Sequence, residues 1–425
     1  MCHSFLPNRY KKLVLTAVFL LPAGNVLALD LKQAEQLAVQ SDPLIERFRA
    51  SSRSFEERSF AVDTLPDPKL RLGASNLPVD TFDIDQEAMT QLKVGIQQNF
   101  PAGDTLEIRQ QQSKFLSRSE MALAEDARLK IIRDVRETYL NLYYETTAHQ
   151  IILETKKLFA DLVKITEAVY ASGRSSQQDV VLANLELARL DDRITKIQAR
   201  EEGYRATLAQ WIGDAAWASI SMDFPALPEL PDKVDLNVVI PQHPVILAES
   251  ARVEASKQQV ELARQEYKPG FSATVDYGFR AGQNPDNTDR VDFLTAMVSM
   301  DIPLFTENRQ DRNVSANVQK TAAARHVKDD KLRILKRYYE KNYYLWQRLG
   351  ERQVLYKNSL LTSASNNTET ALTAYQSGVS EFNTLMRAEI TELDVRLEDL
   401  RVRIDRAIAQ AKLLYITGET NNEKK

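Results

Sequence analysis

The sequence has little glycine, little proline and almost no cysteine. Only 13 Gly and 15 Pro interrupt 425 residues, which predicts long secondary-structure elements instead of two or three compact domains. The single cysteine, Cys2, lies in a segment that we expect to be removed. The mature chain would then have no disulfide, no thiolate metal site and no cysteine able to carry a lipid anchor.

A hydrophobic run long enough to cross a bilayer as a helix is also missing. The best candidate, residues 13–21, is far shorter than the roughly 20 residues required. It follows three basic residues within positions 9–12 and precedes Val26-Leu27-Ala28, which is the layout of a secretory signal. We predict a signal peptide over residues 1–28. The alternative is an N-terminal membrane anchor, although Pro22 closes the run early.

The charge balance argues against nucleic-acid binding. The formal net charge is −4, and loss of residues 1–28, which carry three basic and no acidic side chains, would bring it to about −7. With 43% hydrophobic and 27% charged residues, the chain is too apolar for disorder and too polar for a helical membrane protein. An acidic exported protein is a poor nucleic-acid binder.

Sequence motifs for catalysis or metal binding are missing as well. The sequence contains no glycine-rich phosphate loop and no nucleophile elbow. Its histidines are not paired at ligand spacing, so we predict no metal site and no cofactor. An envelope enzyme or binding protein therefore has little support. The histidines are His3, His149, His243 and His326.

Two apolar stripes follow a coiled-coil period. After Tyr375-Gln-Ser-Gly378 and after Tyr170-Ala-Ser-Gly173, apolar residues recur at alternating steps of four and three, interrupted in the earlier stripe by Glu201. A period of about 3.5 predicts helices that supercoil left-handedly around one another. The later stripe is Met386, Ile390, Leu393, Leu397, Leu400, Ile404, Ala407, Ala411 and Leu414; the earlier one is Leu187, Leu190, Ile194, Ile197, Tyr204, Leu208 and Trp211.

Other stretches alternate apolar and polar residues with a period of two, which is typical of strands with one apolar face. Long helices are predicted between them. A helix over residues 103–172 would be about 100 Å long at 1.5 Å per residue, and a second runs over 307–375. A shorter helix, 31–64, begins after Asp30 and is interrupted at Pro43. The alternating stretches lie in residues 69–75, 91–100, 271–280 and 294–302.

The same order of elements occurs twice. Pro43 and Pro68 reappear as Pro244 and Pro269, each 201 residues later. We therefore predict two internal repeats, each with a helix, a β-hairpin and a long helical hairpin. The predicted domains are a signal peptide 1–28, a first repeat 29–213 with hairpin 68–100 and a turn near 173, a Pro-rich connector 214–235, a second repeat 236–417 with hairpin 270–302 and a turn near 378, and a polar tail 418–425.

The length and alternation of the four predicted strands are typical of an outer-membrane barrel. Four strands cannot close around a pore, and an open edge in lipid leaves backbone groups unpaired. Three copies would supply twelve strands and a hollow cylinder of helices. The alternative is a soluble pair of β-hairpins packed on a coiled-coil stalk.

This order of elements resembles the TolC family of outer-membrane efflux proteins over residues 29–417. The resemblance implies a mainly α fold with a small β part, in which a homotrimer forms a twelve-stranded barrel continued by a periplasmic coiled-coil barrel. It also implies passive export of substrates that an inner-membrane pump delivers through a periplasmic adaptor. Leu65-Pro66-Asp67-Pro68 resembles the heavy-metal efflux branch. The alternative function is a periplasmic coiled-coil adaptor or a structural envelope protein.

The resemblance also implies two kinds of functional residue near the glycine turns. The turns would touch the adaptor, or their glycines would only cap helices. Aspartates just past the turns would form a threefold ring that constricts the pore and favours cations. Asp179 keeps this pattern, whereas Thr384 and Arg387 depart from it; Glu381, Glu389 and Glu392 are nearby substitutes or merely solvated charges. The implied docking residues are Ser172, Gly173, Arg174, Ser175, Ser377, Gly378, Val379 and Ser380; the implied constriction residues are Asp179, Glu381, Thr384 and Arg387.

Overall fold

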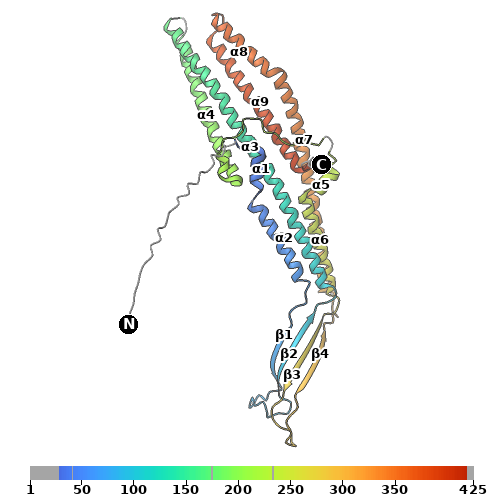
Figure 1. The fold of residues 1–425 in the computed structure, drawn as a ribbon. Helices are drawn as coiled ribbons and strands as arrows, with labels where there is room; N and C mark the ends of the chain where they lie inside the picture. The colour runs from blue at the N-terminus through green and yellow to red at the C-terminus, as the bar shows by residue number, and fades with distance from the viewer. Residues whose placement is uncertain (1–27, 41, 174–175, 232–233, 419–425) are drawn as a thin grey trace, which may run out of the picture.

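The chain folds into an elongated molecule, mostly helical, with one small antiparallel sheet at one end and two helical hairpin tips at the other (Figure 1). The computed structural model describes residues 28–418 except Ser41, 174–175 and 232–233. The predicted signal peptide lies outside the described residues apart from Ala28, as does the predicted tail apart from Gly418.

The first part of the chain begins with two helices separated near Pro43, as the sequence predicts. The Asp42 side chain caps the second helix by accepting the backbone N–H of Leu44 at 2.8 Å and that of Ile45 at 3.3 Å. The elements are α1 (Leu31–Gln40), α2 (Pro43–Ala61), β1 (Lys69–Ser75), β2 (Gln91–Phe100), α3 (Thr105–Ala171), α4 (Gln177–Ile212) and the 3-10 helix η1 (Gly213–Trp217). Because of η1, the segment after Gly213 is not irregular throughout.

The second part contains the elements α5 (Leu236–Gln242), α6 (Pro244–Gln265), β3 (Phe271–Phe279), β4 (Phe293–Met300), α7 (Gln310–Leu355), the π-helix η2 (Tyr356–Leu360), α8 (Leu361–Gln376) and α9 (Phe382–Thr417). The predicted second long helix starts at Gln310, not at Glu307. It is also not uniform, because in η2 the backbone N–H of Leu361 donates to the carbonyl of Tyr356, five residues earlier.

The sheet is four-stranded and fully antiparallel, with the order β1-β2-β3-β4. Each rung of the ladder crosses all or most of the strands; the central one joins Leu70, Ile96, Val275 and Ala296. The pairing of β2 with β3 brings together strands from the two parts of the chain. The order leaves β1 and β4 as the edges, and within the described residues neither has a strand on its outer side.

Helix α3 forms the centre of the helical part, and α2, α4, α6 and α9 pack along it. Val135, Tyr139, Leu140 and Leu142 of α3 are almost completely buried, and burying each such side chain contributes about 1.5–3 kcal/mol. The Tyr139 hydroxyl donates to the carbonyl of Leu29 at 2.7 Å. The N-terminal segment is thereby held against the middle of α3.

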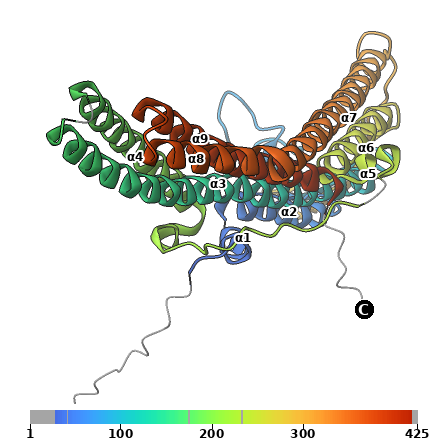
Figure 2. The same cartoon turned by 90° about the horizontal axis from the view of Figure 1, so that it is seen from above.

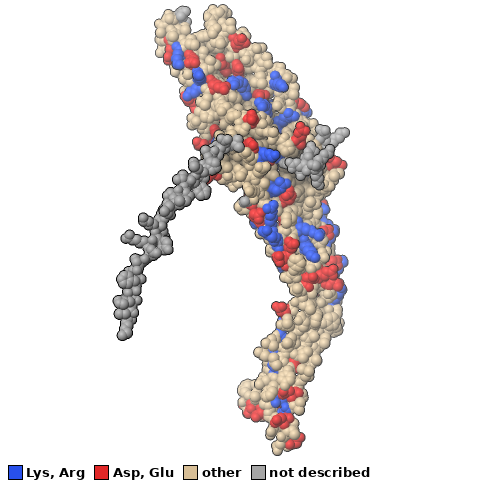
Figure 3. Space-filling view, viewed as in Figure 1, with Lys and Arg blue, Asp and Glu red and all other residues tan. Residues whose placement is uncertain are grey.

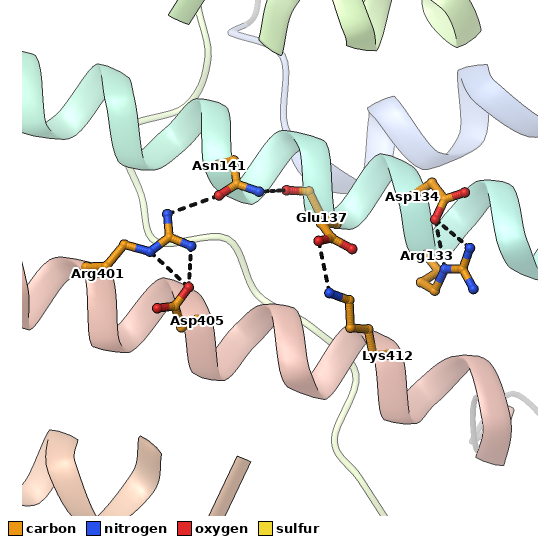
Figure 4. A network of polar contacts seen from close by, with 7 residues as sticks. All are labelled: Arg133, Asp134, Glu137, Asn141, Arg401, Asp405 and Lys412. Carbon is orange, nitrogen blue, oxygen red and sulfur yellow. Dashed lines mark hydrogen bonds and ion pairs between the residues drawn. The ribbon is translucent and has the colours of Figure 1, made fainter. Parts of the chain in front are cut away.

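Polar contacts hold α3 against α9 in the same region (Figure 4). Lys412 Nζ lies 2.9 Å from Glu137 Oε1, and Arg401 donates to Asn141 Oδ1 at 3.0 Å while it pairs with Asp405. The Arg401 guanidinium also stacks on the Tyr144 ring at 5.0 Å. These bonds fix the axial register of two helices that lie more than 200 residues apart in sequence.

Seen from above, the helices form a curved layer, with α4 at one end and α7 with α6 at the other (Figure 2). The layer does not close on itself. Large apolar side chains are exposed along both ends, including Val181 and Leu185 on α4 and Val354 and Leu355 on α7. Apolar residues left uncovered at both ends of one layer are typical of a surface that another chain covers.

Candidate functional site

The two central strands of the sheet, β2 and β3, carry their apolar side chains on an open face and their polar side chains on a sheltered one. In β2, Leu92, Val94 and Ile96 are exposed, whereas Gln91 and Gly95 between them are buried. Strand β3 repeats this pattern, with exposed apolar side chains alternating with buried Thr274, Asp276 and Gly278. A sheet of a soluble protein buries its apolar face instead. This sheet therefore has the reverse arrangement.

Glycines allow polar side chains to fill the sheltered face. A Cβ on Gly95 would stand 1.9 Å from Asp276 Oδ1, and one on Gly278 would stand 2.5 Å from Gln91 Oε1. A Cβ on Gly95 would also stand 2.8 Å from the backbone carbonyl oxygen of Val275, so glycine is required there, whereas the flexible Gln91 side chain could move away from a Cβ at position 278. Lys93 and Gln97 lie on the same face of β2 as Gly95, so β2 presents polar side chains to this side of the sheet along its length.

The outer face of the sheet is apolar over a broad band. Leu72 and Leu294 are each 75% exposed and Val298 is 73% exposed. On the side shown in Figure 3, few charged side chains lie over the strands, and acidic ones gather at the loop end. The band is far more extensive than the scattered surface apolar residues of a soluble protein. Separately, none of the helices in the described part of the chain is long and apolar enough to span a membrane.

The two glycine turns lie together at the opposite end of the molecule (Figure 1). Gly173 and Gly378 have φ values of +74° and +75°, a conformation that other residues adopt only at a cost. At the second turn, Gly378 N–H donates to Tyr375 and Val379 N–H to Ala374, which is a complete Schellman motif. Both glycines therefore cap helices, and a Cβ at either position would meet open space.

The predicted docking residues have different surroundings. Ser172 and Ser377 are the C-caps of α3 and α8. Val379 is 84% exposed at the extreme end, which makes it the most accessible of the predicted docking side chains for which the structure gives an exposure. Ser380 is half-buried. Arg174 and Ser175 lie outside the described residues.

Of the predicted constriction residues, Asp179 has a structural role. Its side chain accepts the backbone N–H of Ser176 at 3.1 Å, while Ser176 Oγ accepts the N–H of Asp179 at 3.2 Å. This capping box starts α4. Glu381 is the N-cap of α9 but makes no side-chain capping bond. Thr384 and Arg387 are exposed on the first two turns of α9.

One glutamate considered for the constriction differs from the others. Glu389 is only 8% exposed, and burial together with the nearby charge of Glu392 raises its pKa. It lies in a pocket between α3 and α8/α9. The interpretation of Glu389 as a solvated flank charge is therefore wrong. Its position in the apolar pattern could not show this, because the covering side chains come from α3 and α8.

His243, one of the four histidines, is buried as the N-cap of α6. Its Nδ1 accepts the backbone N–H of Val245 at 3.3 Å, and Nε2 lies 3.0 Å from the carbonyl of Tyr415. Burial lowers its pKa, although the charge of Asp126 acts in the opposite direction. Throughout the described ranges, no three His, Cys, Asp or Glu side chains converge so as to hold a metal ion.

Comparison with known proteins gives three findings. Residues 236–419 match the model of the outer membrane efflux protein family. No curated protein matches the chain. Several solved structures have the same fold, at identities of 18% or less.

Three of these structures illustrate the likeness. The outer-membrane channel OprN superposes with a TM-score of 0.78 at 17% identity, over 92% of this chain and 90% of OprN. The outer membrane protein VceC from Vibrio cholerae gives 0.76 at 18% identity, over 92% and 96%. The CmeC outer membrane channel from Campylobacter jejuni gives 0.77 at 14% identity, over 92% and 85%.

Proposed function

We propose that this chain is the outer-membrane exit channel of a tripartite efflux or secretion system, because residues 236–419 match the model of the outer membrane efflux protein family. In this role it exports small molecules or ions passively and catalyses no reaction. The sheet crosses the outer membrane, in contact with its lipid, and the helices extend into the periplasm. The resemblance of residues 65–68 to the heavy-metal branch stays a prediction.

The observation that carries this proposal is the reversed sheet. Apolar side chains such as Leu72, Ile96 and Val298 are exposed on one face, and in the central strands β2 and β3 the polar side chains are sheltered. In water this arrangement would expose apolar surface at a cost of about 25 cal/mol per Å². In a membrane the same face contacts lipid and the polar face lines an aqueous pore. A periplasmic adaptor or a structural envelope protein would have no use for such a sheet.

The edges of the sheet support closure by a homotrimer. Among the residues that the structure describes, no strand pairs with the outer side of β1 or β4, and these two strands run in opposite directions because the four strands alternate. Strand β4 of one copy can therefore pair antiparallel with β1 of the next, and three copies close twelve strands without an open edge. The apolar ends of the helical layer, at α4 and α7, would meet in the same interface.

The proposed assembly also accounts for the repeated order of helices and strands along the chain. The series α1 to α4 and α5 to α9 each contain two short helices, two strands and a long helical hairpin. We interpret these as two internal repeats, 29–213 and 236–417, joined by the connector 214–235. Two repeats in each of three chains place six similar units around the pore. A barrel built this way is close to sixfold symmetric.

The exposed glycine turns suit contact with a periplasmic adaptor, which would couple the channel to an inner-membrane pump. Val379 lies in the second turn and is 84% exposed. Photo-crosslinking from Val379 in the native host tests this contact. Capture of an adaptor supports the docking role of the tips; normal trimers with no capture from Val379 refute it and leave Gly378 only as a helix cap.

The channel itself is tested by conductance. Purified protein in detergent should sediment as a trimer and should produce steps of ionic current in a planar bilayer. A soluble monomer without conductance would refute the proposal. The matched variants described in the Discussion separate failure of membrane insertion from failure to open.

A further inference from the structure

The pocket between α3 and α8/α9 has a volume of about 240 Å³ and lies close to the tips. Glu389 is seven residues into α9, so the pocket is about 10 Å along that helix from its start. The volume is below the roughly 300–1,000 Å³ of sites for drug-sized ligands. It fits one side-chain-sized group. Its lining residues are Glu154, Thr155, Leu158, Thr368, Glu389, Glu392, Leu393 and Arg396.

Glu389 is a buried acceptor without a donor. It is more than nine-tenths buried, and it makes no hydrogen bond or ion pair with any residue that the structure describes. Burial removes much of the water that would otherwise solvate this carboxylate, and this raises its pKa. The site is therefore incomplete, and a donor carrying positive charge would complete it.

The neighbouring hydroxyls also present acceptors only. Thr155 Oγ1 donates its hydrogen to the carbonyl of Ile151 at 3.0 Å, and Thr368 Oγ1 donates to the carbonyl of Ala388 at 3.2 Å. Each hydroxyl has one hydrogen, which is already used, so toward a ligand it can act only as an acceptor. Both threonines are buried. The polar lining next to Glu389 thus favours a ligand rich in N–H donors.

The remaining lining determines which cation fits. No three carboxylates of the described residues converge as metal ligands, whereas Ca²⁺ or Mg²⁺ needs several oxygens at about 2.0–2.6 Å. Leu158 and Leu393 supply apolar walls that suit a methylene stem. At the rim, Arg396 lies 3.3 Å from Glu154 in a solvent-exposed ion pair, and such a pair is worth only about 0–1 kcal/mol. It opposes entry of a cation only weakly.

We propose that this pocket binds an alkylguanidinium or alkylammonium group, with Glu389 as its buried counter-ion and Leu158 and Leu393 along its stem. The group belongs either to a free organic cation or to an Arg or Lys side chain of another chain. The chemistry is the same in both cases. The proposal depends on one subunit only and stands apart from the proposed channel function.

The test is a saturation-transfer NMR titration of the full-length, detergent-solubilised protein with n-propylguanidinium chloride. We expect saturable binding that Glu389→Gln weakens at least about tenfold, because a charge-assisted hydrogen bond contributes roughly 1.5–3 kcal/mol. The matched control is Glu369→Gln, which removes the same charge from an exposed site on α8 next to Thr368 and should leave binding unchanged. Arg396→Gln should strengthen binding by removing the competing charge at the rim.

Competition experiments define the ligand class. Butylammonium should displace the probe, whereas tetramethylammonium, which has no N–H donor, should not. The proposal is overturned if binding is not saturable, if Glu389→Gln binds as well as the parent chain, or if MgCl₂ displaces the probe at lower concentration than butylammonium. Glu369→Gln and Arg396→Gln keep the Glu389 carboxylate, so they show whether the fold tolerates a charge change here.

The source of the group is found by carbodiimide crosslinking in outer-membrane fractions, which joins a carboxylate to a lysine amine in direct contact. A crosslinked peptide that contains Glu389 and a lysine of another chain assigns the site to that chain. Probe binding by NMR without such a crosslink assigns it to a free organic cation or an arginine side chain. Neither the NMR binding measurement nor the crosslinking depends on whether the protein conducts ions.

Discussion

A lysine on the apolar face of the sheet should prevent membrane insertion, whereas a lysine at the next position, on the polar face, should not. Ile96 lies in the middle of β2 and is 59% exposed on the apolar face, opposite Leu70 and Val275. Gln97 is the next residue and lies on the polar face, opposite Lys69 and Thr274. Ile96→Lys and Gln97→Lys thus place the same side chain on the two sides of one strand.

The expected magnitudes differ strongly. A lysine facing lipid at the bilayer midplane costs about 2–4 kcal/mol, which lowers the folding equilibrium by roughly 30- to 900-fold, and in a trimer the cost is incurred three times. A lysine facing water in the pore is destabilised only by repulsion from the charge of Lys69 opposite, by about 0.2–1 kcal/mol. The packing lost with Ile96 is limited because its side chain is already mostly exposed.

The assay is urea-dependent folding into lipid vesicles, followed by the mobility of unheated and heated samples in SDS gels and by bilayer conductance. Ile96→Lys should give little folded trimer, and Gln97→Lys should fold and conduct like the parent chain. If Ile96→Lys inserts as well as Gln97→Lys, the face of Ile96 does not contact lipid. A soluble hairpin protein would give this opposite result, because lysine on an exposed strand face improves solubility.

Three further predictions follow from the helical part. Gly378→Ala should destabilise the second tip by about 1–2 kcal/mol because residue 378 has a positive φ. Gly203→Ala, inside α4 with open space around it, should stabilise its helix by about 0.5–1 kcal/mol. Amide hydrogen exchange at each site measures both effects, and equal protection in the two variants would contradict the capping role of Gly378. Burial lowers the pKa of His243 in the folded state, so the unfolded chain binds a proton at higher pH than the folded chain does. The free energy of unfolding should therefore decrease as the pH falls below about 6.5. His243→Asn keeps a capping acceptor but does not titrate, so urea titrations at pH 7.5 and 5.5 should show a smaller decrease for this variant. Asp179→Ala should cost about 0.5–1 kcal/mol through loss of the capping box. If the carboxylate also lines the pore, as the family resemblance implies, the same change should move the reversal potential in a KCl gradient toward zero, a shift that Glu369→Gln should not produce.

The interfaces between α3 and α9 could not be read from the sequence. The ion pair of Glu137 with Lys412 and the bond of Arg401 to Asn141 join residues 260 or more positions apart. Heptad spacing predicts that a helix has a partner, but it does not identify that partner or its axial register. Only the packed helices decide this, because register depends on side chains of both.

The π turn over Tyr356–Leu360 is a second feature that the pattern does not contain. Apolar spacing of three and four predicts a continuous helix there. One residue more in a turn changes which face the following side chains occupy without changing the composition. Local propensity does not distinguish the two windings.

The sequence by itself determined the periods and the lengths. The low glycine and proline content and the apolar stripes with a period of about 3.5 residues predict long coiled-coil helices. The alternation of apolar and polar residues with a period of two predicts short strands, and the strands lie where this alternation predicts them. These properties are local, since each depends only on the backbone repeat and on which side chains can share a face.

Tertiary structure alone decided which faces are sheltered. Alternation marks Ile96 and Gln97 as opposite faces but cannot say which is open; that follows from pairing β2 with β3, where Gly95 makes room for Asp276. The burial of Glu389 follows equally from α3 and α8, which pack beside it from distant parts of the sequence. The exposure of a side chain depends on the residues that pack around it, and these are determined only when the chain has folded.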